Sequence, residues 1–165
     1  MNEVLKAIKN RRTVRRFKPN PIDEEMLQMI LEAGRWAPSF SNLQPWRFIV
    51  IKDQGLKNAL DKAARESVLH LGINEAPVVI LVCVDRRIDP LHAIEAGAAA
   101  TQNMTLAAYS LGLGAGWIGI WGGEQRLKLL SKKFLNSLRQ LERFLCFPSA
   151  FRMSLQKATG SPSKS

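Results

Sequence analysis

The 165-residue sequence predicts one main domain of the α+β class, and three observations lead to this prediction. Hydrophobic residues make up 46% of the chain and charged residues 23%, an ordinary balance for a globular protein. Two apolar runs of strand length, residues 47–52 and 78–84, lie among segments with helical periodicity. The order of these segments lacks the strict β-α-β alternation that is typical of a parallel sheet.

Two helices are predicted in the N-terminal part. Residues 2–10 form a short helix with its apolar residues on one side. After two prolines, a second helix begins at Asp23 and is expected to end at residues 34–36. Asp23 is a good N-cap, and Glu24 and Glu25 complement the positive end of the helix.

A loop over residues 38–45 is expected next, because prolines bracket small polar residues there. It leads into the strand at 47–52, whose uninterrupted apolar run predicts burial on both faces. Residues 55–71 read as a helix. Pro77 then opens the most apolar strand, residues 78–84.

A long helix is predicted over residues 90–111, with Gly97 and three alanines in its middle. Such small residues allow another helix to approach closely, which suits a packed or subunit-interface helix. Three glycines, at positions 112, 114 and 116, then predict a turn into a short strand at residues 117–120.

The net charge of +10 is concentrated at the C-terminal end. Residues 1–130 carry 17 Lys/Arg and 13 Asp/Glu, whereas residues 131–165 carry seven and one. A nucleic-acid footprint needs a basic face across the folded domain. We therefore expect no nucleic-acid partner, although a small basic nucleic-acid-binding domain is kept as a less favoured alternative.

Other compositional features predict a cytoplasmic protein without a membrane span. No apolar run approaches the roughly 20 residues needed to cross a bilayer. The N-terminus has no apolar stretch typical of a secretory signal. Cys83 and Cys146 match no metal-binding or redox spacing, so free thiols and no metal site are expected.

The stretch RRTVRRF, residues 11–17, packs four arginines into seven residues. Arginine matches phosphate oxygens bidentately, and a threonine hydroxyl adds a neutral donor. In an extended segment Arg11, Thr13 and Arg15 would share one face, because alternate positions do so. The alternative is a solvated basic face at the end of a helix.

Two further stretches suit a flat heterocycle. APSFSNLQPW, residues 37–46, carries small polar and amide side chains that offer both donors and acceptors. GLGAGWIG, residues 112–119, has glycines that let the backbone approach a flat ligand closely. Taken singly, the first is usually just a turn, and the second is a weak motif.

In this order and spacing, the three stretches resemble the FMN-dependent nitroreductase family, of the short NAD(P)H:flavin oxidoreductase type. APSFSNLQPW is similar to the family's P-S-x-x-N-x-Q-P-W loop at every defined position. The resemblance covers roughly residues 3–130. It implies a nitroreductase-like fold, with a central, mostly antiparallel sheet flanked by helices. It also implies a homodimer that builds two flavin sites at its subunit interface.

The resemblance implies three groups of FMN-binding residues. The phosphate and ribityl end would be held by Arg11, Arg12, Thr13 and Arg15. The isoalloxazine and ribityl groups would meet residues of the other subunit, namely Pro38, Ser39 and Asn42, with Gln44 as support. One face of the ring would be covered by Trp117, Ile118 and Gly119.

The implied reaction is hydride transfer from NADH or NADPH to flavin, and from flavin to an electron-poor acceptor such as a nitroaromatic or a quinone. No catalytic side chain is expected, because the cofactor carries the reaction and the protein positions it. The two histidines, His70 and His92, are expected to have surface or structural roles. The alternative is a flavin-binding protein with little or no turnover, owing to a defective C-terminal tail.

Residues 131–165 form this atypical basic tail, in which the family's final strand is not recognisable; if the reading frame is shifted, we expect irregular structure from about residue 147. One interpretation is a divergent tail, helical over residues 124–145. The other is a shifted reading frame, because a neighbouring frame can be back-translated to S-F-G-F-P-D-E-S-P-K-G-N-R-K-S-L-E, which resembles the family's missing strand end. The nucleotide sequence of the gene distinguishes the two interpretations.

Overall fold

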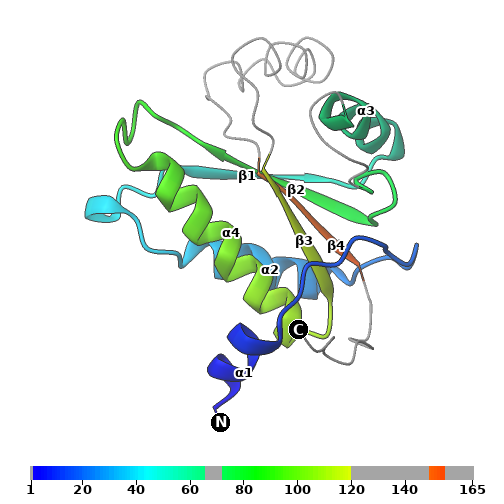
Figure 1. Ribbon diagram of the computed structural model, residues 1–165. Helices are drawn as coiled ribbons and strands as arrows, with labels where there is room; N and C mark the ends of the chain where they lie inside the picture. The colour runs from blue at the N-terminus through cyan, green and yellow to red at the C-terminus, as the bar shows by residue number, and fades with distance from the viewer. Residues whose placement is uncertain (1, 66–71, 120–148, 155–165) are drawn as a thin grey trace.

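The computed structural model describes residues 2–65, 72–119 and 149–154, and it confirms the α+β class (Figure 1). The four strands form one sheet in the order β1-β2-β4-β3, with antiparallel neighbours. In chain order the elements are α1 (Glu3–Asn10), α2 (Glu24–Arg35), the 3₁₀ turn η1 (Phe40–Asn42), β1 (Trp46–Ile51), α3 (Gln54–Arg65), β2 (Val78–Val84), α4 (Ala93–Ser110), β3 (Gly114–Gly119) and β4 (Ser149–Ser154).

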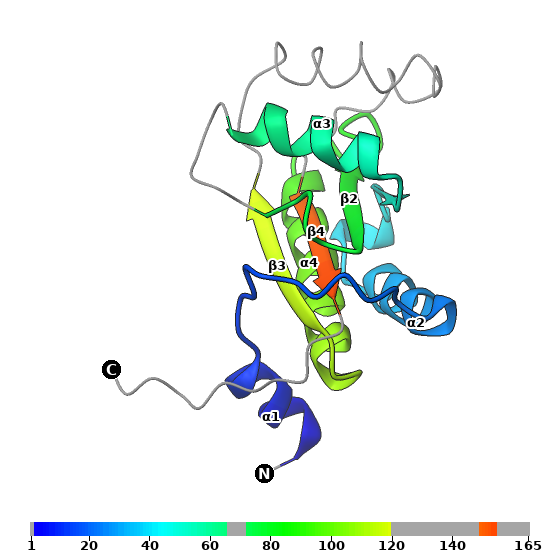
Figure 2. The same ribbon diagram turned by 90° about the vertical axis from the view of Figure 1, so that its right-hand side faces the viewer.

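Strand β2, predicted as the most apolar strand, lies inside the sheet and is buried on both faces. Val78, Ile80 and Val82 point into one core cluster, which contains residues of α2 and α4. Val79 points the other way, into a second cluster with Leu60 of α3. The molecule therefore has three layers, with α2 and α4 on one face of the sheet and α3 on the other (Figures 1 and 2).

The start of α2 follows the local signals in the sequence. The Asp23 side chain accepts a hydrogen bond of 2.8 Å from the Glu25 N–H, which caps the helix as predicted. Ile22 and Leu27 belong to the same buried cluster, where they bracket the first turn. Glu24 also forms an ion pair with Lys52, next to the end of β1.

The first long strand contacts a core cluster on each face, as predicted, but its burial is incomplete: Phe48 and Val50 pack against the cluster of α2 and α4, and Ile49 against that of α3. β1 occupies an edge of the described sheet, and Phe48, Ile49 and Val50 in its middle are only half-buried. A strand inside a sheet is covered by neighbours on both sides, whereas an edge strand is not. An apolar run alone does not distinguish the two positions.

Gly97, the glycine among the small residues of α4, faces a strand, while α2 packs elsewhere on the same helix; a subunit-interface role for α4 stays a prediction. A Cβ atom added to Gly97 would lie 2.7 Å from Cγ1 of Val84, at the end of β2. The close approach between α4 and α2 depends instead on Gly34 of α2, beside the Met104 side chain. The glycine in α4 therefore sets the distance between this helix and the sheet.

Two further expectations about strands are corrected. β3 begins at Gly114, so two of the three glycines assigned to a turn lie within the strand; Gly112, with a φ of 76°, makes the turn. Residues 149–154, expected to be irregular, form β4, which lies between β2 and β3. The predicted helix over residues 124–145 lies outside the described residues, as do His70, Ile120 and Cys146.

We predict that Gly97→Ala lowers the free energy of unfolding. Helix propensity favours alanine by up to about 1 kcal/mol, but the added methyl group would overlap buried Val84, and overpacking costs about 1–3 kcal/mol. The expected net loss is about 1 kcal/mol, measured by urea denaturation. Gly55→Ala at the exposed start of α3 is the control: its added Cβ would lie 3.2 Å from Oδ1 of Asp53, a surface side chain that can shift, so the loss should stay below about 0.5 kcal/mol. Equal stability of the two variants would contradict the packing argument.

Candidate functional site

The arginine-rich segment runs beside β3. After α1 ends, Thr13 forms an isolated parallel bridge with Ala115, and the Val14 N–H donates to the Ala115 carbonyl at 2.8 Å. The Val14 side chain covers Gly114, where an added Cβ would lie 3.0 Å from Val14 Cγ2. A bulky side chain at position 114 would push the segment away. Glycine in β3 and valine in the segment thus hold RRTVRRF against the edge of the sheet.

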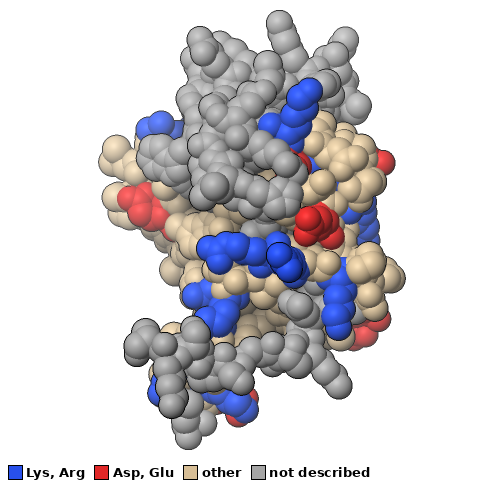
Figure 3. Space-filling view, turned by 45° about the vertical axis from the view of Figure 1, so that its right-hand side comes forward, with Lys and Arg blue, Asp and Glu red and all other residues tan. Residues whose placement is uncertain are grey.

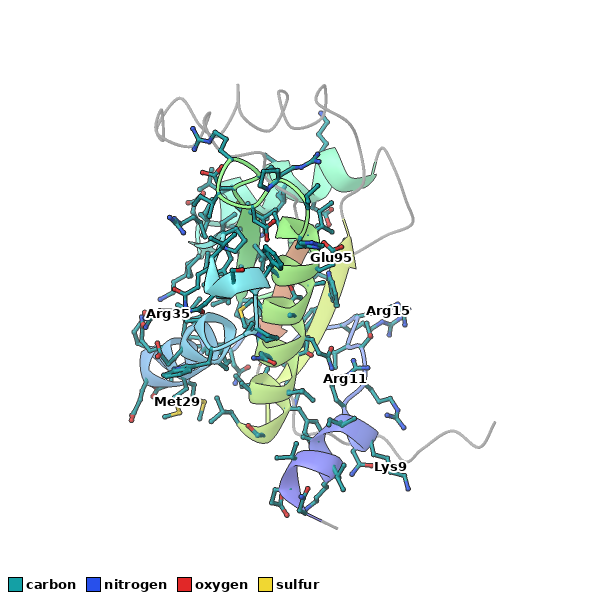
Figure 4. The ribbon with its side chains drawn as sticks, turned by 90° about the vertical axis from the view of Figure 1, so that its left-hand side faces the viewer. Lys9, Arg11, Arg15, Met29, Arg35 and Glu95 are labelled. Atoms are coloured by element: carbon teal, nitrogen blue, oxygen red, sulfur yellow. The ribbon has the colours of Figure 1, made fainter. Side chains whose placement is uncertain are left out.

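This attachment leaves positive charge exposed. Val14 is half-buried and the flanking Thr13 and Arg15 are exposed, but strict alternation does not hold, because Arg12 and Arg16 are also exposed and Arg11 is half-buried. Within the described part of the chain, no carboxylate pairs with Arg11, Arg15 or Arg16. Arg11 and Arg15 lie together beside β3 in Figure 4. Figure 3 shows Lys and Arg side chains side by side across the middle of one face.

Arg12 has a local structural contact. Its guanidinium donates to the carbonyl oxygens of Lys9 and Arg11, at 2.7 Å and 2.9 Å. These contacts satisfy the end of α1, where carbonyl groups lack helical partners. Of the four residues predicted to hold a phosphate, Arg12 is therefore the one whose side chain is already engaged by its own backbone.

The third predicted motif lies on the same edge strand. Ile118 is 6% exposed and belongs to the core cluster on the α3 side. Trp117, 40% exposed, points to the opposite face, and Gly119 ends β3. An edge strand directs half of its backbone polar groups away from the sheet, which suits a role in meeting a flat ligand. The structure thus brings RRTVRRF and GLGAGWIG together.

The loop over residues 38–45 lies at the other edge of the sheet. It precedes β1, whereas the arginines lie beside β3, and β2 and β4 separate these two strands. At about 4.8 Å per strand, the separation is about 14 Å. Figure 1 shows the loop and the arginine segment on opposite sides of the molecule. A single chain therefore does not bring Pro38, Ser39, Asn42 and Gln44 to the arginines.

The loop has a strained backbone that sequence reasoning missed. Ser41, Asn42 and Gln44 all have positive φ, at 46°, 55° and 50°. Asparagine tolerates this region, but nothing in the sequence signals it for serine or glutamine. Such conformations cost about 1–3 kcal/mol each and cluster at functional sites. Ser39 stabilises the loop, because its Oγ accepts a hydrogen bond of 3.0 Å from the Gln44 N–H.

Other candidate chemistry is sparse in the described residues. His92 lies at the surface before α4, with its ring centroid 5.0 Å from that of Phe40 and its Nδ1 4.0 Å from Glu95. Cys83 is buried and forms no disulfide. Among the residues placed by the structure, no three His, Cys, Asp or Glu side chains gather as a metal site, and no helix has the length and apolarity to span a membrane.

The sequence matches the Nitroreductase family over residues 8–76 and 68–148, so the match continues past the expected boundary near residue 130. A relative from Methanothermobacter thermautotrophicus, named "Putative NADH dehydrogenase/NAD(P)H nitroreductase", is 34% identical over 134 residues, 80% of this chain and 69% of the relative. The FMN reductase [NAD(P)H] of Bacillus subtilis is 32% identical over 149 residues, 77% of this chain and 58% of the relative.

A similar fold occurs in a nitroreductase with bound FMN from Desulfitobacterium hafniense. The TM-score is 0.80 at 27% identity, over 100% of this chain and 95% of that one. The antiparallel sheet flanked by helices is thus the nitroreductase-like fold that the sequence predicts. The chain belongs to the nitroreductase family.

Proposed function

We propose that the protein is an FMN-dependent oxidoreductase that passes hydride from NADH or NADPH through the flavin to an electron-poor acceptor such as a nitroaromatic or a quinone. The enzyme class, an NAD(P)H-dependent flavin oxidoreductase with FMN as cofactor, is supported by family membership and by the names of its relatives. The observation that carries the proposal is the exposed arginine segment attached to β3 in a chain of this family.

The arginine segment fits the phosphate end of FMN. Arg11 and Arg15 have no carboxylate partner among the described residues, and Thr13 between them is exposed. Clustered guanidinium groups repel one another, so a dianionic phosphate would relieve that repulsion and accept bidentate hydrogen bonds. Arg12 would contribute to phosphate binding mainly through its positive charge, because its guanidinium already donates to the carbonyl groups at the end of α1.

The ring end would lie along β3. Backbone groups of Trp117, Ile118 and Gly119 would meet the isoalloxazine, while Ile118 anchors the strand in the core. Bound FMN supplies the hydride chemistry, accepting from the nicotinamide and donating to the acceptor. The residues of this chain bind and orient the ring; no side chain is assigned as a catalytic acid or base.

The loop over residues 38–45 would complete the site of a partner subunit. Its position at the far edge of the sheet supports exchange between two copies, because one chain leaves the loop about 14 Å from the strand that would bind the ring. Large exposed apolar side chains support an interface as well. They include Val4, Leu5 and Ile8 on α1, Trp36 after α2, Phe40 in the loop and Leu91 before α4.

A second candidate is a flavin-binding protein with little or no turnover. The basic composition of residues 131–165 is what suggests it, although the family match extends to residue 148 and residues 149–154 form β4. In this alternative, residues 1–130 form the FMN-binding domain and the tail, divergent or out of frame, limits the reaction. We place either form in the cytoplasm.

The purified protein is expected to carry FMN and to oxidise NADH or NADPH when a quinone or nitroaromatic is added. Visible absorbance and mass spectrometry of the released cofactor measure the first property, and loss of nicotinamide absorbance measures the second. Bound FMN without turnover would select the second candidate. A protein that neither contains nor takes up FMN would overturn both.

Arg11→Ala and Arg15→Ala are each expected to weaken FMN binding about tenfold to a hundredfold, because a hydrogen bond to a charged group contributes about 1.5–3 kcal/mol. Riboflavin lacks the phosphate, so its affinity should change much less. Arg35→Ala is the matched control, since Arg35 pairs with Glu32 on α2, away from the segment (Figure 4). Equal losses for FMN and riboflavin would show that the arginines serve the fold instead.

The protein is expected to sediment as a dimer at micromolar concentration, because the loop and the arginines of one site come from different copies in this proposal. Analytical ultracentrifugation with detection at flavin wavelengths measures mass and cofactor together. A monomer that still holds one flavin per chain would contradict the shared site.

A further inference from the structure

The turn after β2 contains a buried carboxylate held by a guanidinium. Asp85 directly follows β2, and its side chain is 4% exposed, against 60% for Arg87. Asp85 Oδ1 accepts from the backbone N–H and from Nε of Arg87, both at 2.9 Å, and Oδ2 accepts from Nη2 at 2.6 Å. Such a two-pronged contact fixes orientation as well as distance.

This turn also holds the end of the loop over residues 38–45. The Asp85 N–H donates a hydrogen bond of 2.8 Å to the carbonyl of Pro45, the last residue of the loop. The next residue, Trp46, pairs with Val84 at the start of the β1–β2 ladder. The backbone at Asp85 is therefore the point where the loop joins the rigid sheet.

The loop needs such an anchor because its own conformation is strained. Residues in the left-handed region persist only when their surroundings hold them there. At the front of the loop, Ala37 is 6% exposed and packs in a cluster with Trp46 and α4. At the back, the hydrogen bond from Asp85 holds Pro45. Between these anchors lie the three non-glycine residues that have positive φ in the described part of the chain.

We propose that Asp85 and Arg87 are positioning residues for the flavin-binding loop, which they hold in its strained conformation through the Pro45 carbonyl without touching the flavin. This inference rests on the proposed function of the loop. Neither residue belongs to the motifs that carry the family resemblance.

The charge state of Asp85 agrees with this role. The hydrogen bond from the Arg87 side chain holds the pKa of Asp85 below its ordinary value, and the positive charge of Arg47 lowers it further. The carboxylate is therefore ionised at neutral pH. Removing Arg87 would leave a buried carboxylate without its guanidinium fork, and the turn would rearrange to hydrate it.

The test compares Arg87→Ala with Arg86→Ala in the full-length protein. Arg86 is the adjacent exposed arginine, and it has no ion pair among the described residues, so its removal changes net charge equally but leaves Asp85 held. Amide hydrogen exchange at Gln44 and Asp85 measures the loop and its anchor directly. Titrations of the flavin-free protein with FMN and riboflavin measure the effect on flavin affinity. Arg87→Lys tests whether a positive charge suffices without the two-pronged guanidinium contact.

In Arg87→Ala we expect faster exchange at both amides and a loss of about tenfold in affinity, equal for FMN and riboflavin, because the loop would meet the ring and ribityl groups that both ligands share. Arg86→Ala should match the unmodified protein, and Arg87→Lys should fall between the two. Circular dichroism confirms that each variant is folded; if Arg87→Ala is not, Arg87→Lys carries the comparison.

The inference would be overturned if amide exchange at Gln44 and Asp85 were unchanged in Arg87→Ala. If Arg87→Ala does not fold, the same result in Arg87→Lys would overturn it. Faster exchange with unchanged flavin affinity would overturn the inference too, because Arg87 would then stabilise the loop while the loop contributed nothing to flavin binding. A loss confined to FMN would assign Arg87 to the phosphate and also refute a positioning role. Failure of the unmodified protein to bind any flavin would instead refute the proposed function, so the two failures are distinguishable.

Discussion

Burial of β2 on both faces is the constraint on which the rest of the structure depends. A strand with apolar side chains on both faces needs a layer on each side of the sheet, and α2 with α4 and α3 supply those layers. It also needs a hydrogen-bonded neighbour along each edge, and β1 and β4 take those places. The order of the sheet then puts β1 and β3 at opposite edges. The separation of the two candidate ligand-binding segments is thus a consequence of how the core is built.

Both segments violate local rules of stability. The arginine segment gathers like charges on an exposed stretch, and the loop holds three non-glycine residues in the left-handed region. A sequence under selection for stability alone would disperse the charge and place glycine or asparagine in the loop. A contact nearby compensates for each violation. The Val14 side chain packs on Gly114 and holds the segment, and the Asp85 N–H donates to the Pro45 carbonyl and holds the loop. Local conflict beside a rigid support is typical of a ligand site.

The parts of the fold that were predicted correctly depend on neighbours in sequence. The cap at Asp23 and the apolar run of β2 are local signals, and the structure confirms both. The errors concern choices made by distant residues. Gly97 marks a close approach, but whether a helix or a strand approaches is decided by Val84. The apolar run of β1 gave no sign of its edge position, because that depends on the sheet order.

The same division applies to the candidate site. The three motifs could be quoted from the sequence, and the attachment of the arginines beside β3 agrees with the shared role proposed for them. The role of Asp85 could not be predicted, because an aspartate two residues before an arginine is common at turns and becomes informative only when the carboxylate is buried and the backbone N–H donates to Pro45. The positive φ of Ser41 and Gln44 likewise follows from the closed shape of the loop, not from residue type.

The placement of β4 has a consequence for how the chain is made. Residues 149–154 are the last described part of the chain, yet they pair with β2 on one side and β3 on the other. β2 and β3 leave the ribosome well before β4, which pairs with both of them. Until β4 is synthesised, each of the two strands has one edge without a hydrogen-bonded neighbour. Such edges are templates for pairing with other chains. During synthesis there is therefore an interval in which the sheet lacks its inner strand β4. In that interval a chaperone that covers the open strand edges would matter more than the stability of the finished fold.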